Sequence, residues 1–344
     1  MTVSTSSSVC LPVQKREKPL LHVRDLTVKF HTTRGLVTGV DRMNFTLDRG
    51  KVLGLVGESG SGKSVTALSL LRLIPKDTAE ISNGEIWFDN QNLVTLPEKN
   101  LREIRGRDIG MIFQDPMTSL NPIASIGSQV TEPLKSHLGM TRAQSSRRAE
   151  ELLELVGIRE AKKRLAQYPH ELSGGMRQRV MIAMAIACEP KLIIADEPTT
   201  ALDVTTQAQI LDLLQKLRTD LGVSIILITH DLGVVAEFAD DVQVMYAGRA
   251  VERSSVQKIF EQPAHPYSDG LLKSIPSFDS EVERLVSIEG TVPSPFALPP
   301  GCAFAPRCTH ARSACTAEVP SFRKISADRH AACLFPLAGS GVGL

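Results

Sequence analysis

A glycine-rich segment at residues 57–64, Gly-Glu-Ser-Gly-Ser-Gly-Lys-Ser, constrains the fold of this chain more than any other feature. The apolar run at residues 51–56 precedes it and is typical of a buried strand. Residues 65–74 follow with helical spacing and end before Pro75. A glycine-rich loop between a strand and a helix predicts a phosphate-binding loop in an α/β fold with a mainly parallel sheet.

The residue types of this loop suit a nucleotide triphosphate. Glycine lets the backbone turn tightly and direct N–H groups inward, and the helix N-terminus that follows adds partial positive charge. Lys63 can reach the β- and γ-phosphates, and the Ser64 hydroxyl can bind Mg²⁺. The predicted ATP-binding residues of the loop are Gly57, Glu58, Ser59, Gly60, Ser61, Gly62, Lys63, Ser64 and Val65.

Two adjacent acids follow a second apolar run, residues 191–195. The carboxyl ends of parallel strands face the crevice where ligands bind, so Asp196 and Glu197 are expected beside the phosphate loop. Asp196 suits Mg²⁺ coordination together with Ser64. Glu197 suits activation of the attacking water, by polarising or deprotonating it.

Two more apolar runs, residues 108–113 and 223–229, deliver Gln114 and His230. A glutamine side chain donates and accepts hydrogen bonds, so Gln114 can bridge Mg²⁺ and the attacking water. His230 is expected to contact the γ-phosphate. The predicted catalytic residues are therefore Glu197, His230 and Gln114, and the predicted Mg²⁺ ligands are Ser64, Gln114 and Asp196.

A second anion-binding segment reads Leu-Ser-Gly-Gly-Met at residues 172–176. Its serine and glycines open a helix expected over residues 176–188, and a helix N-terminus attracts phosphate. With the features above, this segment resembles the signature motif of the nucleotide-binding subunits of ATP-binding-cassette (ABC) transporters. The resemblance covers roughly residues 20–260.

The resemblance implies an ABC nucleotide-binding domain in which two subunits share each nucleotide. The signature motif and interface loop of one subunit then contact ATP held by the other. The residues expected to act in trans are Leu172, Ser173, Gly174, Gly175, Met176, Gln178 and Asp203. Phe30 matches the aromatic residue that stacks on adenine in this family, with a role in the core as the alternative.

The motif positions and composition predict three segments within the 344 residues. Residues 1–19 are expected to be a disordered arm, and residues 20–260 an ABC ATPase domain with a helical subdomain at about 115–179. Residues 261–344 are expected to form a small C-terminal extension that contains cysteines. His265-Pro266-Tyr267 resembles a segment in the C-terminal extension of the oligopeptide/dipeptide importer subfamily. This resemblance implies peptide import. Related solutes (nickel complexes, glutathione or opines) and a non-transport ABC ATPase are the alternatives.

The chain carries 39 Lys and Arg against 38 Asp and Glu, which gives no broad electrostatic footprint for nucleic acid. It contains no apolar run of the ~18–20 residues that a membrane span needs, and no secretory signal is recognised. The expected location is therefore the cytoplasmic face of the inner membrane, with peripheral attachment through partners. The resemblance implies two transmembrane permease subunits, a solute-binding protein and a second ABC ATPase subunit, and no nucleic acid. The second ATPase subunit is expected to be a different chain, with a second copy of this chain as the alternative.

Four of the six cysteines lie near the C-terminus, with gaps of five, six and seventeen residues between them. They are Cys302, Cys308, Cys315 and Cys333. Disulfides are disfavoured in a cytoplasmic ATPase, and thiolates can hold zinc or an iron–sulfur cluster. The absence of a closely spaced pair and the resemblance to cluster-bearing members of the subfamily favour a [4Fe–4S] cluster. Zn²⁺ and reduced structural thiols are the alternatives.

Overall fold

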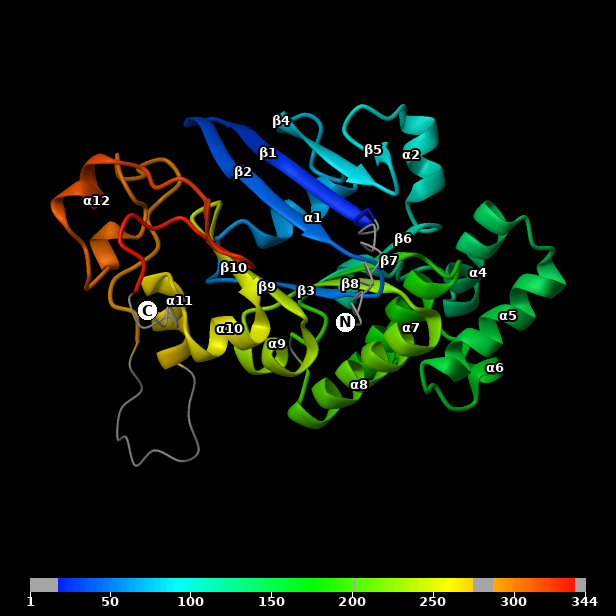
Figure 1. Ribbon diagram of the computed structural model, residues 1–344. Helices are drawn as coiled ribbons and strands as arrows, with labels where there is room; N and C mark the ends of the chain where they lie inside the picture. Colours follow the sequence, from blue (N-terminus) through cyan, green and yellow to red (C-terminus); the bar gives the residue numbers. More distant parts are fainter. Residues whose placement is uncertain (1–17, 201, 275–286, 338–344) are drawn as a thin grey trace, which may run out of the picture.

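A computed structural model describes residues 18–200, 202–274 and 287–337 (Figure 1). Nearly all of the arm predicted at residues 1–19 lies outside these ranges. The chain forms two sheets with helices around them. The helical subdomain and the C-terminal extension lie at opposite ends of the molecule, in green and in orange to red. The predicted α/β cassette fold is confirmed, whereas the domain boundary near residue 260 stays a prediction.

The larger sheet has a parallel centre that matches the predicted apolar runs. Its strands are β3 (Val52–Val56), β6 (Ile109–Ile112), β7 (Leu192–Asp196) and β8 (Ser224–Ile228), in the order β3-β8-β7-β6. Every residue of β3, β7 and β8 is buried, as expected for strands covered on both faces. All four strands point the same way, so the segments after them meet at one edge of the sheet.

On its other side the sheet continues through β9 (Asp241–Tyr246), β10 (Arg249–Ser255), β12 (Arg329–Ala331) and β11 (Arg323–Ser326). Strand β9 runs parallel to β3, and the remaining pairs are antiparallel. Two strands of the C-terminal extension thus complete the sheet of the ATPase domain. A link between the two segments through main-chain hydrogen bonds was not predicted.

A second, antiparallel sheet was also not predicted. It contains β1 (Leu21–Thr32), β2 (Gly35–Leu47), β4 (Ala79–Phe88) and β5 (Gln91–Asn92), in the order β2-β1-β4-β5. A two-residue connection joins β1 to β2 and imposes the antiparallel direction. Gly35 takes a φ of +117° there, a left-handed conformation that favours glycine.

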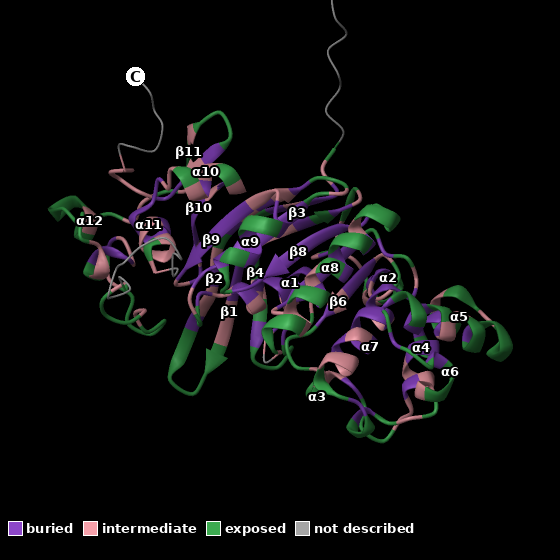
Figure 2. Cartoon of the chain, turned by 90° about the horizontal axis from the view of Figure 1, so that it is seen from below, coloured by how far each residue is buried: buried purple, intermediate pink, exposed green. Residues whose placement is uncertain are grey.

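Outside the helical subdomain, the ATPase domain contains α1 (Lys63–Leu70), α2 (Glu98–Ile104), α8 (Val204–Leu221), α9 (Leu232–Phe238) and α10 (Val256–Glu261). Helix α1 ends earlier than predicted because the chain turns at Arg72, which has a φ of +51°. In Figure 2, α8 and α9 lie over the strands with buried residues toward the sheet and exposed residues outward. This is the amphipathic arrangement expected of helices that cover a sheet.

The helical subdomain contains α3 (Pro116–Ser119), α4 (Ile126–Leu138), α5 (Arg142–Leu155), α6 (Ala161–Arg164), a 3₁₀ turn (Pro169–Glu171) and α7 (Gly174–Ile186). Helix α5 begins with a capping box formed by Thr141 and Gln144. It ends before Gly157, whose φ of +79° suits a helix terminus. Buried apolar residues of α4, α5 and α7 belong to the same core cluster as β7 and β8.

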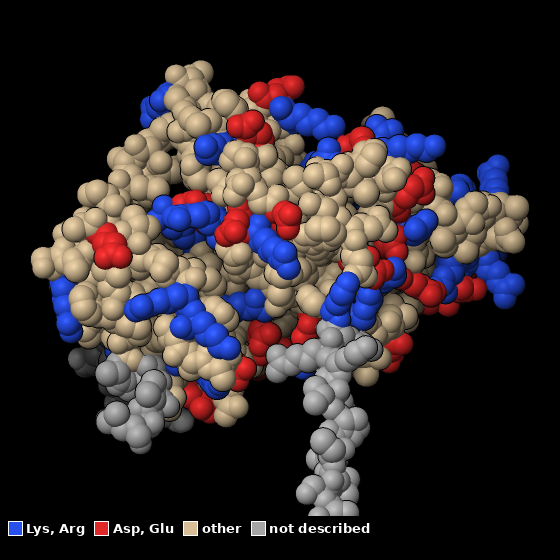
Figure 3. All heavy atoms as spheres, turned by 45° about the horizontal axis from the view of Figure 1, so that its top comes forward, with Lys and Arg blue, Asp and Glu red and all other residues tan. Residues whose placement is uncertain are grey.

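The described part of the extension contains α11 (Pro266–Lys273), a 3₁₀ turn (Ala305–Arg307) and α12 (Ser313–Ala317), besides β11 and β12. Figure 3 shows basic and acidic side chains intermixed over one face of the molecule, as the near-equal totals predict. Within the described residues, no helix has the length and apolar character needed to cross a membrane.

A buried ion pair attaches the extension to β10. Glu252 is fully buried, and its Oε1 accepts a hydrogen bond from Arg329 Nε at 3.0 Å. The same carboxylate accepts the backbone N–H groups of Ala264 and His265, each at 2.8 Å. One charge therefore joins β10, β12 and the start of α11.

We expect Glu252→Gln to lower the free energy of unfolding by about 3–5 kcal/mol, because it leaves the Arg329 guanidinium buried without its carboxylate. Urea unfolding followed by circular dichroism measures the change. Glu103→Gln is the matched control, since its pair with Arg107 is exposed and should contribute less than about 1 kcal/mol. Equal effects of the two substitutions would contradict the role given to Glu252.

Candidate functional site

A cavity of about 270 Å³ lies at the carboxyl edge of the parallel strands. The phosphate loop and the start of α1 form its floor, and Gln114 and Glu197 lie on its side. Strand β2, the turn between β9 and β10, and a loop of the C-terminal extension form the remaining walls. Its lining residues are Val37, Thr38, Gly39, residues 59–65, Gln114, Glu197, Ala247, Gly248, Pro293, Pro295 and Leu298.

The loop depends on glycine at two places where other chain segments approach closely. A Cβ atom at Gly57, which has a φ of +150°, would collide with the carbonyl oxygen of Met245. At Gly62, with a φ of +97°, it would lie 2.7 Å from the carbonyl oxygen of Gly39. The loop is therefore held between β2 and the end of β9, and only glycine fits these positions.

Lys63 is 5% exposed and lies beneath the loop. Its Nζ donates hydrogen bonds to the carbonyl oxygens of Gly57 at 2.7 Å and Glu58 at 3.1 Å. Burial lowers the pKa of Lys63, while the charges of Glu197 and Asp196 act in the opposite direction. A cation placed here favours a phosphate group above the loop.

Asp196 ends β7, and its Oδ1 accepts a hydrogen bond from the Ser64 hydroxyl at 3.1 Å. Burial raises the pKa of this carboxyl group, and the bond from Ser64 partly offsets that effect. The structure thus places two of the three predicted Mg²⁺ ligands in contact. The third, Gln114, instead donates its amide N–H to Glu197.

Glu197 has a φ of +47°, a left-handed conformation that costs energy for a residue with a side chain. Its Oε2 accepts hydrogen bonds from Gln114 Nε2 and from the Thr200 hydroxyl, each at 2.9 Å. The Nδ1 of His230 lies 3.6 Å from Oε1. The three predicted catalytic residues therefore meet around one carboxylate at the edge of the cavity. Thr200 was not predicted, and only its position three residues after Glu197 could have indicated it.

Phe30 does not line this cavity among the described residues. Phe30 belongs to β1, and its half-buried ring packs against Gly39 of β2, where a Cβ atom would lie 2.6 Å from Cε2 of the ring. Gly39 itself lines the cavity. The ring therefore lies one residue layer from the cavity.

The signature segment lies away from the cavity, at the exposed N-terminus of α7. This helix begins at Gly174, earlier than predicted, because Ser173 caps it by accepting the N–H of Met176 at 3.3 Å. Ser173 and Gly174 are exposed, whereas Leu172 and Gln178 are buried. No signature residue lines the cavity within the described ranges.

The interface-loop residue Asp203 lies beside this helix start. Its carboxylate caps α8 by accepting the N–H of Thr206 at 2.9 Å and its hydroxyl at 2.7 Å. A Cβ atom at Gly175 would lie 2.8 Å from the methyl group of Thr206, so α7 and α8 begin in close contact. The structure brings the residues predicted to act in trans onto one surface, separate from the cavity of the same chain.

Two side chains of the extension contact the phosphate loop and were not predicted to do so. The hydroxyl of Tyr267 accepts the N–H of Glu58 at 2.9 Å. Arg307 donates two hydrogen bonds to the Glu58 carboxylate, at 2.6 and 3.0 Å. Tyr267 belongs to the sequence triplet noted above, but its partner lies 209 residues away, and that of Arg307 lies 249 residues away.

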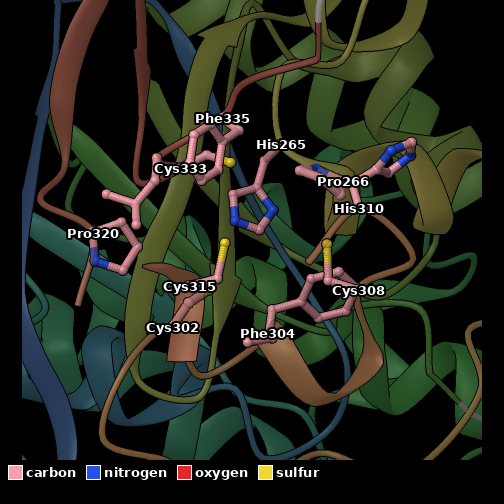
Figure 4. Close-up of a pocket in the computed structure, with 12 residues that line it drawn as sticks. His265, Pro266, Cys302, Phe304, Cys308, His310, Cys315, Pro320, Cys333 and Phe335 are labelled. Atoms are coloured by element: carbon pink, nitrogen blue, oxygen red, sulfur yellow. The ribbon is translucent and has the colours of Figure 1, made fainter. Parts of the chain in front are cut away.

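The four C-terminal cysteines line one cavity, together with His265 and His310 (Figure 4). Figure 4 shows Cys308, Cys315 and Cys333 around the ring of His265. Cys302 also lines this cavity. The residues that line it besides the cysteines and histidines are apolar: Pro266, Phe304, Ala305, Pro320, Leu334 and Phe335. All four cysteines carry free thiols. The sequence alone therefore identified residues that the fold places around a common space.

Burial dominates the electrostatics of this cavity. It raises the pKa of Cys302 and Cys308, and it raises the pKa of Cys333 to about 11. Burial also lowers the pKa of His265 to about 4. The Nδ1 of His265 accepts the N–H of Tyr267, which caps α11. Among the described residues, no group of three or more His, Cys, Asp or Glu is arranged to hold a metal ion.

Two known protein families match this chain, one in the region of each of the two sites. The family "ABC transporter" matches residues 40–200, and the family "Oligopeptide/dipeptide transporter, C-terminal region" matches residues 251–315. The oligopeptide transport ATP-binding protein OppD of Salmonella typhimurium is 51% identical over 318 residues, which are 92% of this chain and 94% of that protein. The oligopeptide transport ATP-binding protein AppD of Bacillus subtilis is 49% identical over 314 residues, which are 91% and 96% of the two chains.

Solved structures agree with this result. The dimeric ATP-binding cassette MJ0796, in a post-hydrolysis state bound to ADP and Pi, is 28% identical with a TM-score of 0.62; the match covers 69% of this chain and 98% of that chain. The protein cbiO1 from Clostridium perfringens, part of an ABC transporter complex, is 31% identical with a TM-score of 0.59 and coverages of 71% and 91%. The chain therefore belongs to the family of ABC transporter ATP-binding proteins, in the group that carries the oligopeptide/dipeptide transporter C-terminal region.

Proposed function

We propose that this chain binds and hydrolyses ATP to energise an ABC importer for di- and oligopeptides. One observation carries the hydrolytic part: the carboxylate of Glu197, contacted by Gln114, Thr200 and His230, lies at the side of a cavity whose floor is a phosphate-binding loop. The match of the C-terminal region and the names of the relatives support the peptide substrate.

The chemistry assigned to the chain follows from this geometry. The loop N–H groups and Lys63 bind the phosphates of ATP, and the positive end of α1 adds to this attraction. Ser64 and Asp196, with Gln114, would hold Mg²⁺, which neutralises charge on the β- and γ-phosphates. Glu197 orients the attacking water and accepts its proton, while His230 contacts the γ-phosphate.

A second ATPase subunit completes each site. The exposed N-terminus of α7 and the neighbouring Asp203 form a surface that can reach the phosphates bound by another cassette. The dimeric assembly of the related cassette MJ0796 supports this arrangement. The partner is expected to be a different ABC ATPase chain, as the subfamily resemblance implies.

The helical subdomain is the proposed contact with two transmembrane permease subunits. Its first segment, α3 and the loop after it, exposes apolar side chains, with Met117 53% and Ile123 85% accessible to solvent. Exposed apolar residues in such a loop suit burial against another protein. Through this contact the chain would lie peripherally at the cytoplasmic face of the membrane. A solute-binding protein would deliver the peptide to the permease subunits.

The C-terminal cysteines are the proposed ligands of a [4Fe–4S] cluster: Cys302, Cys308, Cys315 and Cys333. Four thiols line one largely apolar cavity, which supports this assignment, although within the described residues no group of three or more His, Cys, Asp or Glu is arranged to hold a metal ion. A bound cluster would supply the positive charge that keeps these buried thiols ionised. Its role here is to connect the segments that bear the cysteines, in an extension with a small core.

The first prediction from this proposed function concerns the close approach at the loop. Gly57→Ala should weaken ATP binding by at least about tenfold, because the added methyl group collides with the carbonyl oxygen of Met245 and displaces the loop. Gly35→Ala is the control, since Gly35 also has a positive φ but no atom within 4 Å of the added carbon. Titration calorimetry with ATP measures both variants. Equal affinities in the two variants would count against the predicted collision.

The second prediction concerns hydrolysis. Glu197→Gln should preserve ATP binding, lower kcat by about 10²-fold or more and trap a closed ATP-bound dimer, because the amide cannot accept the proton of the attacking water. Steady-state ATPase assays and size-exclusion chromatography measure these effects. Glu189→Gln at the opposite end of β7 is the control and should retain the wild-type kcat. Normal turnover of Glu197→Gln would defeat the assignment.

The third prediction concerns the cysteines. Anaerobically purified protein should contain about four iron and four acid-labile sulfide per chain, with visible absorbance, and Cys308→Ser should lose them. Cys188→Ser should retain them, because Cys188 lies outside the cavity lining. A measured content of one zinc per chain would contradict the cluster and indicate a single-metal site. Neither metal would leave the cysteines as structural thiols.

A further inference from the structure

We propose that Arg307 of the C-terminal extension is a positioning residue for ATP binding, because it fixes the phosphate loop through Glu58. This inference rests on the proposed ATPase function of the same site. Through Arg307 the extension is part of the nucleotide site and not only attached to the ATPase domain.

The contact between Arg307 and Glu58 is a two-pronged ion pair. Nη1 of Arg307 lies 2.6 Å from Oε2 of Glu58, and Nη2 lies 3.0 Å from Oε1. Such parallel bonds fix both the distance and the orientation of the carboxylate. The Arg307 side chain is 4% exposed and that of Glu58 31% exposed, so solvent screens this pair less than a surface pair.

The guanidinium of Arg307 is itself held by the extension. Its Nε donates to the carbonyl oxygen of Glu289 at 2.9 Å, and Nη2 donates to that of Ile288 at 3.2 Å. Nη1 also lies 3.3 Å from the hydroxyl of Tyr246, at the end of β9. Since its donors are engaged on several sides, Arg307 is a fixed anchor.

The backbone of Glu58 is held as well as its side chain. Its N–H donates to the hydroxyl of Tyr267, and its carbonyl oxygen accepts a hydrogen bond from Lys63. The extension therefore restrains a residue that directly contacts the lysine expected to bind the phosphates. A shift of Glu58 would displace this contact and the loop N–H groups beside it.

A second segment of the extension reaches the same cavity. Pro293, Pro295 and Leu298 line this cavity together with residues of the phosphate loop. The extension thus contacts the cavity at its wall and supports the loop from outside. A role confined to stabilising the fold does not require either placement.

The test compares full-length variants that lose an arginine at either end of β3. Arg307→Gln removes the ion pair beside the loop at the carboxyl end. Arg218→Gln removes the pair with Asp240 at the amino end, where Arg218 Nη2 lies 2.7 Å from the carboxylate. Both should lower the thermal midpoint. Only Arg307→Gln should raise the Kd and KM for ATP, by about tenfold, with kcat at saturating ATP changed less than threefold.

Four further variants separate positioning from folding. Arg307→Lys keeps the charge but not the paired geometry and should recover part of the lost affinity. Tyr267→Phe removes one hydroxyl group with its ring retained and should raise the Kd by a smaller factor. Glu58→Gln alone should also raise the Kd, and in the double variant Glu58→Gln/Arg307→Gln the Kd should be no higher than in Arg307→Gln, because both changes break one contact.

The inference alone would be overturned by wild-type affinity in Arg307→Gln, or by a fold-increase of the Kd in the double variant equal to the product of the fold-increases in the two single variants. In either case the wild-type chain would still bind and hydrolyse ATP. Loss of affinity in Arg218→Gln equal to that in Arg307→Gln would reduce both arginines to a general effect on folding. A wild-type chain that binds no ATP would overturn the proposed function as well.

Discussion

The close packing of the phosphate loop against two neighbouring segments is the constraint on which the rest of the site depends. Gly57 lies against the end of β9, Gly62 lies against β2, and Gly248 meets the same part of β2, where a Cβ atom would lie 2.9 Å from the carbonyl oxygen of Gly39. Three glycines thus allow the loop and two strands to approach without side chains between them. This contact joins the antiparallel sheet to the parallel one at the cavity.

The fixed loop determines the charges around it. Lys63 is buried because the loop folds over it, and its Nζ is directed at loop carbonyl oxygens. Two carboxylates, Asp196 and Glu197, reach the same cavity edge because β7 lies two strands away from β3 in a parallel sheet. Burial opposes the charged form of Lys63 and Asp196 alike, so each depends on the opposite charge nearby. Binding of phosphates and a cation adds charges of both signs to this balance.

The sequence predicts those parts of the fold that follow from local patterns. Buried parallel strands are continuous apolar runs, so β3, β6, β7 and β8 and the polar residues after them could be placed. The antiparallel sheet was not predicted, because partly exposed strands such as β1 lack that simple pattern. The signature helix begins earlier than predicted, because Ser173 caps it and Gly174 and Gly175 belong to its first turn despite their low helix propensity.

Contacts between distant segments account for the rest. Nothing near Arg307 in the sequence indicates a carboxylate partner 249 residues away. Thr200 lies three residues after Glu197, a position that many ordinary loop residues share relative to an acidic residue. The sequence predicts that the four C-terminal cysteines lie together, because a rare residue type is concentrated in one segment. The sequence does not predict the apolar rings that line the same cavity, because isolated apolar residues show no spacing that indicates a cavity.

One short turn connects the two sites of the molecule. Residues 305–307 form a 3₁₀ turn that ends in Arg307 at the phosphate loop and leads directly to Cys308 in the cysteine cavity. Phe304 precedes the turn and packs edge-on against Tyr246 and at a tilt against Tyr267, with ring centroids 5.3 Å apart in both pairs. Closely packed rings transmit displacements rather than absorb them. The cysteine cavity and Glu58 therefore share neighbours: Phe304 lines the cavity and packs against Tyr267, whose hydroxyl contacts Glu58.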